Sequence, residues 1–436
     1  MRQRTFISVW MRSGLLAAAV LAAGCFLSGA AAAYTYKLLH TFTAGNGPPN
    51  LGGLLRDPDG NLFGTAQGGK FGESYAFKMY QPTPGSRWKL VDIHDFGGGG
   101  DGGLSTGVIR DTNGNLYGTT FDSRSGGGVF YELSPAAGSK WTETVLARLP
   151  SGQTLRAVPD YHGKEAGQFY DGVSPLYDMT DAPSGTHRRG AVVSFTLSGG
   201  TWAYTDIYDF CATGGKFCTD GADPNGGIVV DDAGNLYGVA GDGGHRHGVA
   251  FELSPSGGGW TESVLHAFCA EPRCADGDKP GSSMTIDGAG AIYGTTGLGG
   301  VRPCRKHWEK GCEGVVFKLA PDAGAWDFSV LATFCKRQFC ADGARPSQPV
   351  LDPSGVLFSK TSIGGISNAG AQEGAGTMFA IDGGAVSSLY TFCRQADCAD
   401  GQLPNSPPVI DPSGNIFGTT QNGGAYGDGV AFELIP

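Results

Sequence analysis

Hydrophobic and polar positions recur along this 436-residue chain as one unit written seven times. Each unit has an aromatic residue, a phenylalanine eight positions later, a Gly/Pro turn, an Asp-x-x-Gly-Asn-Leu-Tyr-Gly-Thr-like segment, a glycine pair and a closing Val-Phe-x-Leu segment. The clearest copies read WTESVLHAF at 260–268, GGIVVDDAGNLYGVA at 226–240 and GVAFELSP at 248–255. Such repetition is typical of architectures built from one supersecondary unit.

The aromatic-to-phenylalanine segment predicts a strand. An even spacing places the two rings on one face, because side chains alternate with period two. Val264, Leu265 and Ala267 are apolar on both parities, which predicts that both faces are buried. The copies of this segment are Tyr34/Phe42, Trp88/Phe96, Trp202/Phe210, Trp260/Phe268 and Trp326/Phe334, with Trp141/Leu149 as a weaker copy.

The Asp-x-x-Gly segment predicts a tight hairpin, since Asp can bond the backbone ahead of it and Gly can take positive φ. Copies begin at Asp57, Asp111, Asp231, Asp287, Asp352 and Asp411, and the third copy, near 163–170, is eroded. A glycine inside the following strand carries no side chain and predicts close approach of a backbone segment. This glycine recurs as Gly64, Gly118, Gly238, Gly294 and Gly418.

Four short strands per unit and seven units predict an all-β fold, a seven-bladed β-propeller of four-stranded antiparallel blades. Ring closure covers the sheet faces that each unit leaves open. The predicted propeller is a single domain over residues 34–436, with the third repeat eroded. An open β-solenoid is the alternative, and shorter repeats with atypical capping units would be typical of it.

The G-N-L-Y-G-T-T, glycine-pair and V-F-x-L elements make the whole stretch 34–436 resemble the Gloeobacter/Verrucomicrobia-type tandem repeat, the GloVer repeat of exported bacterial proteins. The resemblance implies export and a repeat fold. It implies no particular activity or substrate.

Residues 1–33 are predicted to be a secretory signal peptide. Arg2, Arg4 and Arg12 precede an apolar stretch at 15–27, and an Ala-rich exit ends at Ala33. Lipid anchoring at Cys25 is the less favoured alternative, because the preceding residues make a weak lipobox. No later run is apolar and long enough to span a bilayer. The predicted location is therefore secreted, periplasmic or at the cell surface.

Ten cysteines remain after Cys25, and they fall into five local pairs. An even number in an exported chain favours disulfides. Zinc is disfavoured because each pair offers two ligands and no recurring His, whereas structural zinc takes four. The predicted disulfides are Cys211/Cys218, Cys269/Cys274, Cys304/Cys312, Cys335/Cys340 and Cys393/Cys398.

The net charge of the chain argues against anionic partners. The chain has a formal net charge of −10, and loss of residues 1–33 removes three Arg and no acid, which brings it to −13. An acidic surface of this kind is poorly suited to nucleic acid or anionic lipid.

Histidines are the main recurring chemical groups. His40, His94 and His266 occupy one repeat position, which other copies fill with residues such as Tyr208, Tyr390 and Ala332. If this strand lay near the axis, the three imidazoles would ring a central channel as metal ligands or acid/base groups. The plainer interpretation is a repeat position that tolerates any flat or polar side chain.

Other candidates lie in loops. His245 and His247 stand at alternate positions of a glycine-rich loop and could share a metal, although no third ligand is evident. The Asp-Pro-Asp-Gly-Asn turns resemble calcium loops but lack the distal Glu, so hairpin chemistry explains them better. No cofactor or metal is predicted.

The eroded third unit is the richest non-repeating stretch in polar and aromatic groups. Since binding sites concentrate on loops held by a rigid scaffold, it is a candidate ligand site, and simple drift of one repeat is the alternative. Its candidate residues are Asp160, His162, Glu165, Tyr170, His187 and Arg188.

The sequence therefore favours an exported, non-catalytic repeat protein that presents a loop face to an extracellular glycan or a surface protein. The alternative is a propeller-type lyase or hydrolase that uses axial His and acidic residues. No hydrolase, metalloprotease, nucleotide-phosphate or dinucleotide motif occurs in a suitable context.

Overall fold

Short apolar runs separated by Asp-Gly and Gly-Gly turns form antiparallel strands throughout the described part of the chain. The computed structural model describes residues 34–436 except 44, 46, 122–126, 138–139, 151–152, 154, 156–159, 162–168, 181–186, 215–216, 301–312 and 366–373. Among the described residues, no helix is long and apolar enough to cross a membrane.

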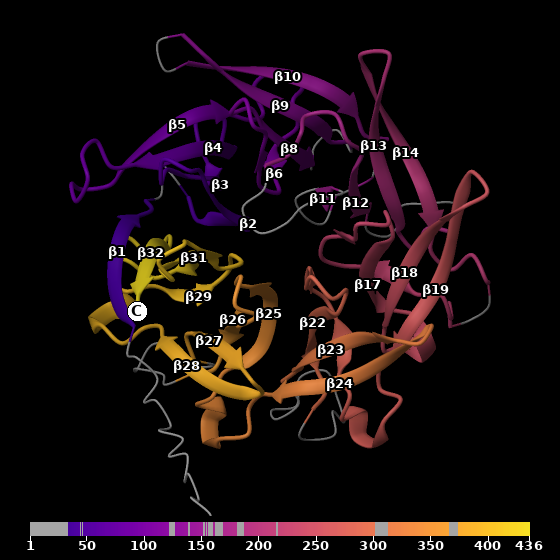
Figure 1. Ribbon diagram of the computed structural model, residues 1–436. Coiled ribbons are helices and arrows are strands. Elements are labelled where there is room, and N and C mark those ends of the chain that lie inside the picture. The colour runs from indigo at the N-terminus through magenta and orange to yellow at the C-terminus, as the bar shows by residue number, and fades with distance from the viewer. Residues whose placement is uncertain are drawn as a thin grey trace, which may run out of the picture. The chain divides into compact units, whose positions relative to one another are not determined.

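The strands form seven blades arranged in a ring, which confirms the predicted propeller (Figure 1). Blades 1 to 3 comprise β2 (Pro49–Arg56), β3 (Leu62–Gly68), β4 (Glu73–Tyr80) and β5 (Lys89–Asp95); β6 (Leu104–Ser105), β7 (Ile109–Arg110), β8 (Leu116–Phe121), β9 (Val129–Ala136) and β10 (Lys140–Arg148); and β11 (Asp160–Tyr161), β12 (Leu176–Thr180), β13 (Ala191–Ser198) and β14 (Thr201–Asp209).

Blades 4 to 6 follow the same order, with short 3-10 segments in their loops. They comprise β15 (Ala222–Pro224), β16 (Val229–Val230), β17 (Leu236–Asp242), η1 (Gly244–Arg246), β18 (Val249–Ser256) and β19 (Gly259–Ala267); η2 (Pro272–Cys274), β20 (Asp278–Pro280), β21 (Thr285–Ile286), β22 (Ile292–Leu298), β23 (Val315–Asp322) and β24 (Ala325–Thr333); and η3 (Gln338–Cys340), β25 (Ala344–Leu351), β26 (Leu357–Ile363), β27 (Thr377–Asp382) and β28 (Ala385–Thr391).

Blade 7 is built from both ends of the described chain. After η4 (Ala396–Cys398), it contains β29 (Gln402–Pro404), β30 (Val409–Ile410), β31 (Ile416–Asn422) and β32 (Val430–Ile435), and β1 (Thr35–Thr41) pairs antiparallel with β32. The first strand of each blade lies toward the axis and the fourth forms the outer wall (Figure 1). The aromatic-to-phenylalanine segment is this fourth, outermost strand.

The outer position corrects one expectation from the sequence. These strands are not buried on both faces, because no further strand of the described residues covers them, and Val264 is 41% exposed. The apolar residues at odd and at even positions of these strands instead pack against the blades on the two sides.

A β-bulge corrects a second expectation. The register of every outer strand shifts by one residue, and in β19 the shift falls at Leu265, between His266 and Val264. The extra residue switches the face of the strand to which the following side chains point. Trp260 therefore packs against Tyr177 of blade 3, whereas Phe268 packs against Phe317 of blade 5, so the two rings do not share a face. The bulged residues are Leu39, Ile93, Leu146, Ile207, Leu265, Leu331 and Leu389.

The hydrophobic core is divided among the seams between blades. One cluster, for example, joins Met179 and Val192 of blade 3 to Phe251 and Leu253 of blade 4. The strand glycine makes this packing fit: a Cβ on Gly238 would lie 2.4 Å from Cζ of Phe251, its cross-strand partner. A neighbour does approach Gly238 closely, but it is an aromatic side chain and not the backbone segment that the sequence predicts.

The Asp-x-x-Gly turns are confirmed as hairpins between the first and second strands. Asp57 Oδ1 accepts the backbone N–H of Asn61 at 2.8 Å, and Oδ2 accepts the Asn61 side-chain amide at 2.8 Å. The same pair recurs as Asp111/Asn115, Asp231/Asn235 and Asp411/Asn415. Because both oxygens serve the turn, hairpin chemistry explains these carboxylates without calcium.

Copy three places its turn at Asp171, which lies five residues before Leu176 of β12 as Asp111 does before Leu116 of β8. Asp171 Oδ1 accepts the N–H groups of Val173 and Ser174 at 2.8 Å. The expected location near 163–170 is therefore slightly too early, because inserted residues hide the motif in the sequence.

Candidate functional site

One rim of the ring carries two sets of loops. Strand direction alternates within a blade, so the loop between the second and third strands and the loop that leads to the next blade emerge on the same side. The disulfide loops belong to the second set and the His245/His247 loop to the first. We call this side the disulfide rim. Gly244 N donates to Cys218 O at 3.1 Å, which joins the two sets in blade 4.

Four of the five predicted disulfides are present, namely Cys211–Cys218, Cys269–Cys274, Cys335–Cys340 and Cys393–Cys398. Cys304 and Cys312 lie outside the described residues. The cysteines near His247 are bonded to one another, so they offer no thiolate to a metal.

The Asp of each Cys-x-Asp-Gly element closes its loop from within. In the loop between blades 4 and 5, Asp276 accepts the backbone N–H groups of Ala270 at 3.0 Å and Glu271 at 3.2 Å. Asp342 and Asp400 make the same pair of bonds in the loops between blades 5 and 6 and between blades 6 and 7. These carboxylates therefore have a structural role first.

His40, His94 and His266 lie on β1, β5 and β19, the outermost strands, and not around the axis (Figure 1). The channel placement considered from the sequence is therefore wrong: the first strand of each blade, not this one, borders the axis. Burial lowers the pKa of His40, which favours the neutral ring.

The structure explains why His and Tyr interchange at this position. His94 Nε2 lies 3.1 Å from Asp101 Oδ2, and His266 Nε2 lies 3.0 Å from Asp276 Oδ2. The hydroxyl groups of Tyr208 and Tyr390 donate to Asp220 and Asp400 at 2.9 and 2.6 Å. Either ring reaches the same loop carboxylate from the same backbone site, which supports the plainer interpretation of these histidines.

The third-unit candidates separate in the structure. Tyr170 is fully buried in the seam between blades 2 and 3 and donates its hydroxyl to Ser174 O at 2.6 Å, so it belongs to the core and not to a ligand surface. Asp160 lies on β11 opposite Tyr177. His162 and Glu165 lie outside the described residues. His187 and Arg188 are exposed on the loop that enters β13.

His187 and His245 occupy one repeat position in adjacent blades. The sequences His187-Arg188-Arg189-Gly190 and His245-Arg246-His247-Gly248 both lead into a third strand, and Asp223 N and Lys279 N donate to Arg189 O and His247 O at 2.8 and 2.9 Å. The two candidate loops thus form one basic stretch of the disulfide rim. His247 is also tied to the scaffold, with Nδ1 3.0 Å from Asp278 Oδ1.

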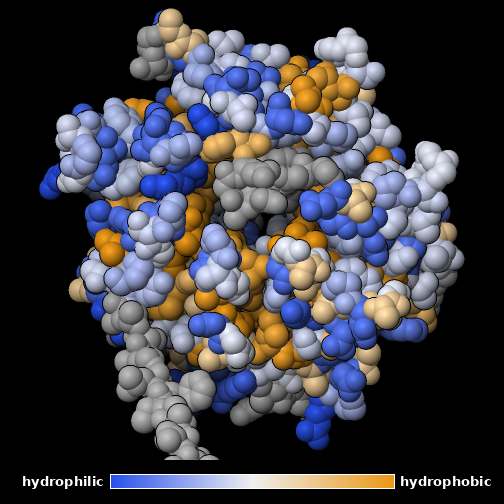
Figure 2. Space-filling model, viewed as in Figure 1, coloured by the Kyte–Doolittle hydropathy of each residue, from blue (hydrophilic) through white to orange (hydrophobic). Residues whose placement is uncertain are grey.

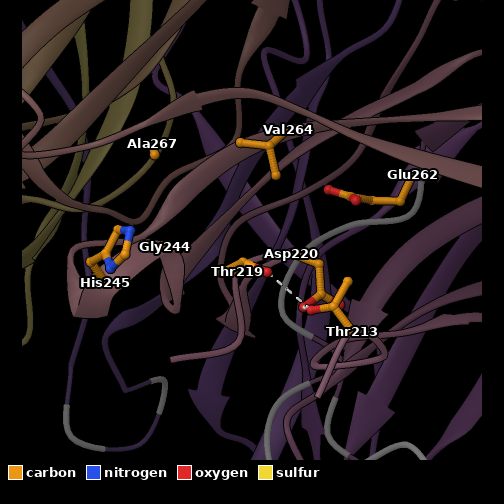
Figure 3. Close-up of a pocket in the computed structure, with 8 residues that line it drawn as sticks. All are labelled: Thr213, Thr219, Asp220, Gly244, His245, Glu262, Val264 and Ala267. Carbon is orange, nitrogen blue, oxygen red and sulfur yellow. Dashed lines mark hydrogen bonds between the residues drawn. The ribbon is translucent and has the colours of Figure 1, made fainter. Parts of the chain in front are cut away.

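A hollow of about 350 Å³ lies beside this stretch, at the seam between blades 3 and 4 (Figure 3). Glu262, Val264 and Ala267 reach it from β19, Gly244 and His245 from η1, and Thr213, Thr219 and Asp220 from the loop between β14 and β15. Phe217, 41% exposed, lies next to it, with its ring centroid 5.9 Å from that of His245.

Burial raises the pKa of Glu262 to about 7, and the nearby Asp220 contributes to the rise. Its Oε1 is buried and has no hydrogen-bond partner among the described residues. Both carboxylate oxygens of Asp220 already accept hydrogen bonds, from Tyr208, Ala212 and Thr213. A protonated Glu262 can donate a hydrogen bond into the hollow, and an ionised one can accept.

Sequence reasoning found His245 but missed Glu262, Asp220 and the two threonines. A signal was present: the position two residues after the aromatic holds Glu only in Glu143 and Glu262, whereas other copies have Tyr36, Leu90, Tyr204 or Phe328. A carboxylate that replaces an aromatic or aliphatic residue in a repeat marks a position that the fold does not explain.

Comparison with known proteins gives a family and a fold. The model of a family described as the Gloeobacter/Verrucomicrobia repeat matches residues 154–371, half of the chain. No curated protein matches.

Among solved structures, a copper-bound fungal alcohol oxidase of the AA5 family is similar with a TM-score of 0.52 and 12% identity, over 93% of this chain and 76% of that one. A protein from Lactobacillus plantarum has a TM-score of 0.51 and 14% identity, over 83% and 89% of the two chains. At such identities the likeness shows the fold alone.

Proposed function

Because the chain belongs to the Gloeobacter/Verrucomicrobia repeat family, we propose that it acts as an exported, non-catalytic binding protein whose disulfide rim holds an extracellular glycan. Export rests on the basic and apolar residues 1–33 and on the disulfides, which persist in oxidising compartments. The repeat supplies a rigid ring, and the binding residues are those that do not recur around it.

The observation that carries the proposal is the hollow between blades 3 and 4. Carboxyl, hydroxyl and imidazole groups converge there beside the apolar face of Val264 and the exposed ring of Phe217. Sugars present hydroxyl groups at their edges and C–H groups on their faces, so polar partners and an aromatic platform suit them together. Hydrophilic residues also cover much of the molecular surface seen in Figure 2.

Phe217→Ala provides the sharpest test, with Tyr426→Ala as a matched control. Both aromatics are exposed, at 41 and 68%, and Tyr426 lies on the same rim in blade 7. Glycans that bind the purified chain in an array should lose at least about tenfold in affinity with Phe217→Ala, equivalent to about 1.4 kcal/mol, and none with Tyr426→Ala. Equal effects of the two changes would refute the site. Binding to cell-surface proteins but to no glycan would replace the glycan by a protein partner.

A catalytic role has one observation in its favour. Glu262, with a pKa raised to about 7, is suited to donate a proton near neutral pH. This proposal does not use the axial histidines on which the alternative from the sequence rests. The outer position of their strands, β1, β5 and β19, rules that alternative out. Glu262→Gln separates the two functions: turnover of a bound glycan that disappears while binding persists would establish an enzyme.

A further inference from the structure

Three side chains able to ligate a metal meet at the outer seam between blades 1 and 2. His94 lies on β5, Asp101 in the loop that follows, and Glu143 on β10. His94 Nε2 is 3.1 Å from Asp101 Oδ2 and 3.7 Å from Glu143 Oε2, and one ligand atom of each residue lies within 4.8 Å of the other two. The side chains are 20, 5 and 16% exposed, so the cluster is largely shielded from water.

The protein scaffold orients the Asp101 carboxylate. Gly97 N and Gly99 N donate to Oδ1 at 3.1 and 3.2 Å, which leaves Oδ2 directed at His94. Hydrogen bonds of this type hold the ligands of protein metal sites in position. The protein therefore orients the Asp101 carboxylate without help from a bound ion.

Comparison among the repeats shows that the fold itself does not need Glu143. At the seam between blades 4 and 5 the same His–Asp pair, His266 and Asp276, meets Phe328, whose ring stacks on the imidazole with centroids 3.7 Å apart. At the seam between blades 3 and 4 the position of the histidine is Tyr208. Within the described residues, only the seam between blades 1 and 2 brings an imidazole close to two carboxylates.

The cluster contains two carboxylates and one imidazole. Glu143 Oε1 is buried and has no hydrogen-bond partner among the described residues. The nearby Arg148 directs its Nη1 to Gly100 O at 2.7 Å. A divalent cation would compensate two carboxylates that the present neighbours compensate only in part.

We propose that His94, Asp101 and Glu143 form a binding site for a zinc-class divalent transition metal. Tetrahedral zinc takes nitrogen and oxygen ligands at about 2.0–2.1 Å, which sets ligand atoms roughly 3.3 Å apart. The distances of 3.1 and 3.7 Å bracket that value. Three protein ligands leave a fourth position for water. Calcium is a poor fit because it takes six to eight oxygens.

The test measures Zn²⁺ binding to chelator-treated, untagged protein by calorimetry and by metal analysis after dialysis. His94→Tyr is the first variant, since Tyr208 and Tyr390 show that tyrosine keeps the bond to the loop Asp. Glu143→Gln is the second and nearly conserves shape. We expect one Zn²⁺ per chain in the wild type, with the dissociation constant raised at least about 100-fold in each variant. Thermal unfolding without metal reports whether each variant folds.

Matched changes at the seam between blades 4 and 5 complete the test. His266→Tyr should leave Zn²⁺ binding unchanged, because Phe328 provides no ligand there. Phe328→Glu should add a second ion. Absence of Zn²⁺ binding by the wild type, or unchanged binding by folded His94→Tyr and Glu143→Gln, would overturn the proposal. A Phe328→Glu chain that gains no ion would overturn the role given to the glutamate.

Discussion

Lys360 of blade 6 donates a hydrogen bond from Nζ to the backbone carbonyl of Pro404 in blade 7, at 3.0 Å. The side chain is only 3% exposed. Desolvation by burial lowers the pKa of Lys360 to about 7, from 10.5 for the free side chain. The amine thus links two inner strands in a place where its charge is costly.

Lys360 should make stability depend on pH. Between pH 7 and 10.5 the unfolded chain binds the proton that the folded chain has released, so stability rises with pH across this window, by at most about 1.4 kcal/mol per pH unit. Lys360→Met should lose this increase. Urea titrations of both proteins at pH 6 to 9 would check it, and a constant difference between them at every pH would contradict it.

Trp260→Ala should destabilise the protein by about 3 kcal/mol, because it removes a large ring from a seam between blades. The indole packs against Tyr177 with ring centroids 5.9 Å apart. Val264→Ala, on the same strand and 41% exposed, is the control and should cost about 0.5 kcal/mol or less. Denaturant titration gives both values, and equal effects would show that the tryptophan is not a packing residue.

Gly238→Ala should destabilise the protein by about 2 kcal/mol, since the new methyl group would overlap the Phe251 ring. Gly288→Ala is a matched control: its added Cβ meets nothing within 4 Å. Thermal unfolding should separate the two variants. Similar melting temperatures would mean that the aromatic ring can move aside without cost.

Non-reducing peptide mapping should find the four local disulfides of the described residues and, as a prediction from spacing, Cys304–Cys312. Closing such short loops contributes about 2 kcal/mol each. Reduction should therefore lower the melting temperature while the strands remain, which far-UV circular dichroism can follow. Links between different blades, or several free thiols, would refute the pairing.

Local chemistry was readable in the sequence because it acts within a few residues. The hairpin at Asp57 and the packing role of Gly238 follow from turn chemistry and the lack of a side chain. The bulge at Leu265 was not readable, since a change of register leaves no mark in the alternation of residues. It placed Trp260 and Phe268 against different neighbouring blades.

The candidate site was harder to predict because it lies between blades. His245 comes from η1, Glu262 from β19 and Asp220 from the loop between β14 and β15, so no single segment contains the hollow. Asp101 and Glu143 are likewise brought together only by the ring. The substitution of Glu for an aromatic or aliphatic residue at one repeat position was the usable signal.

The pairing of β1 with β32 has a consequence for how the ring assembles. Lys37 and Glu433 bond across it at 2.8 Å although 396 residues separate them. Loop-closure entropy opposes contacts of such long range, and they slow folding. β1 therefore remains unpaired in blade 7 until β32 has been synthesised, and the ring closes only at that point.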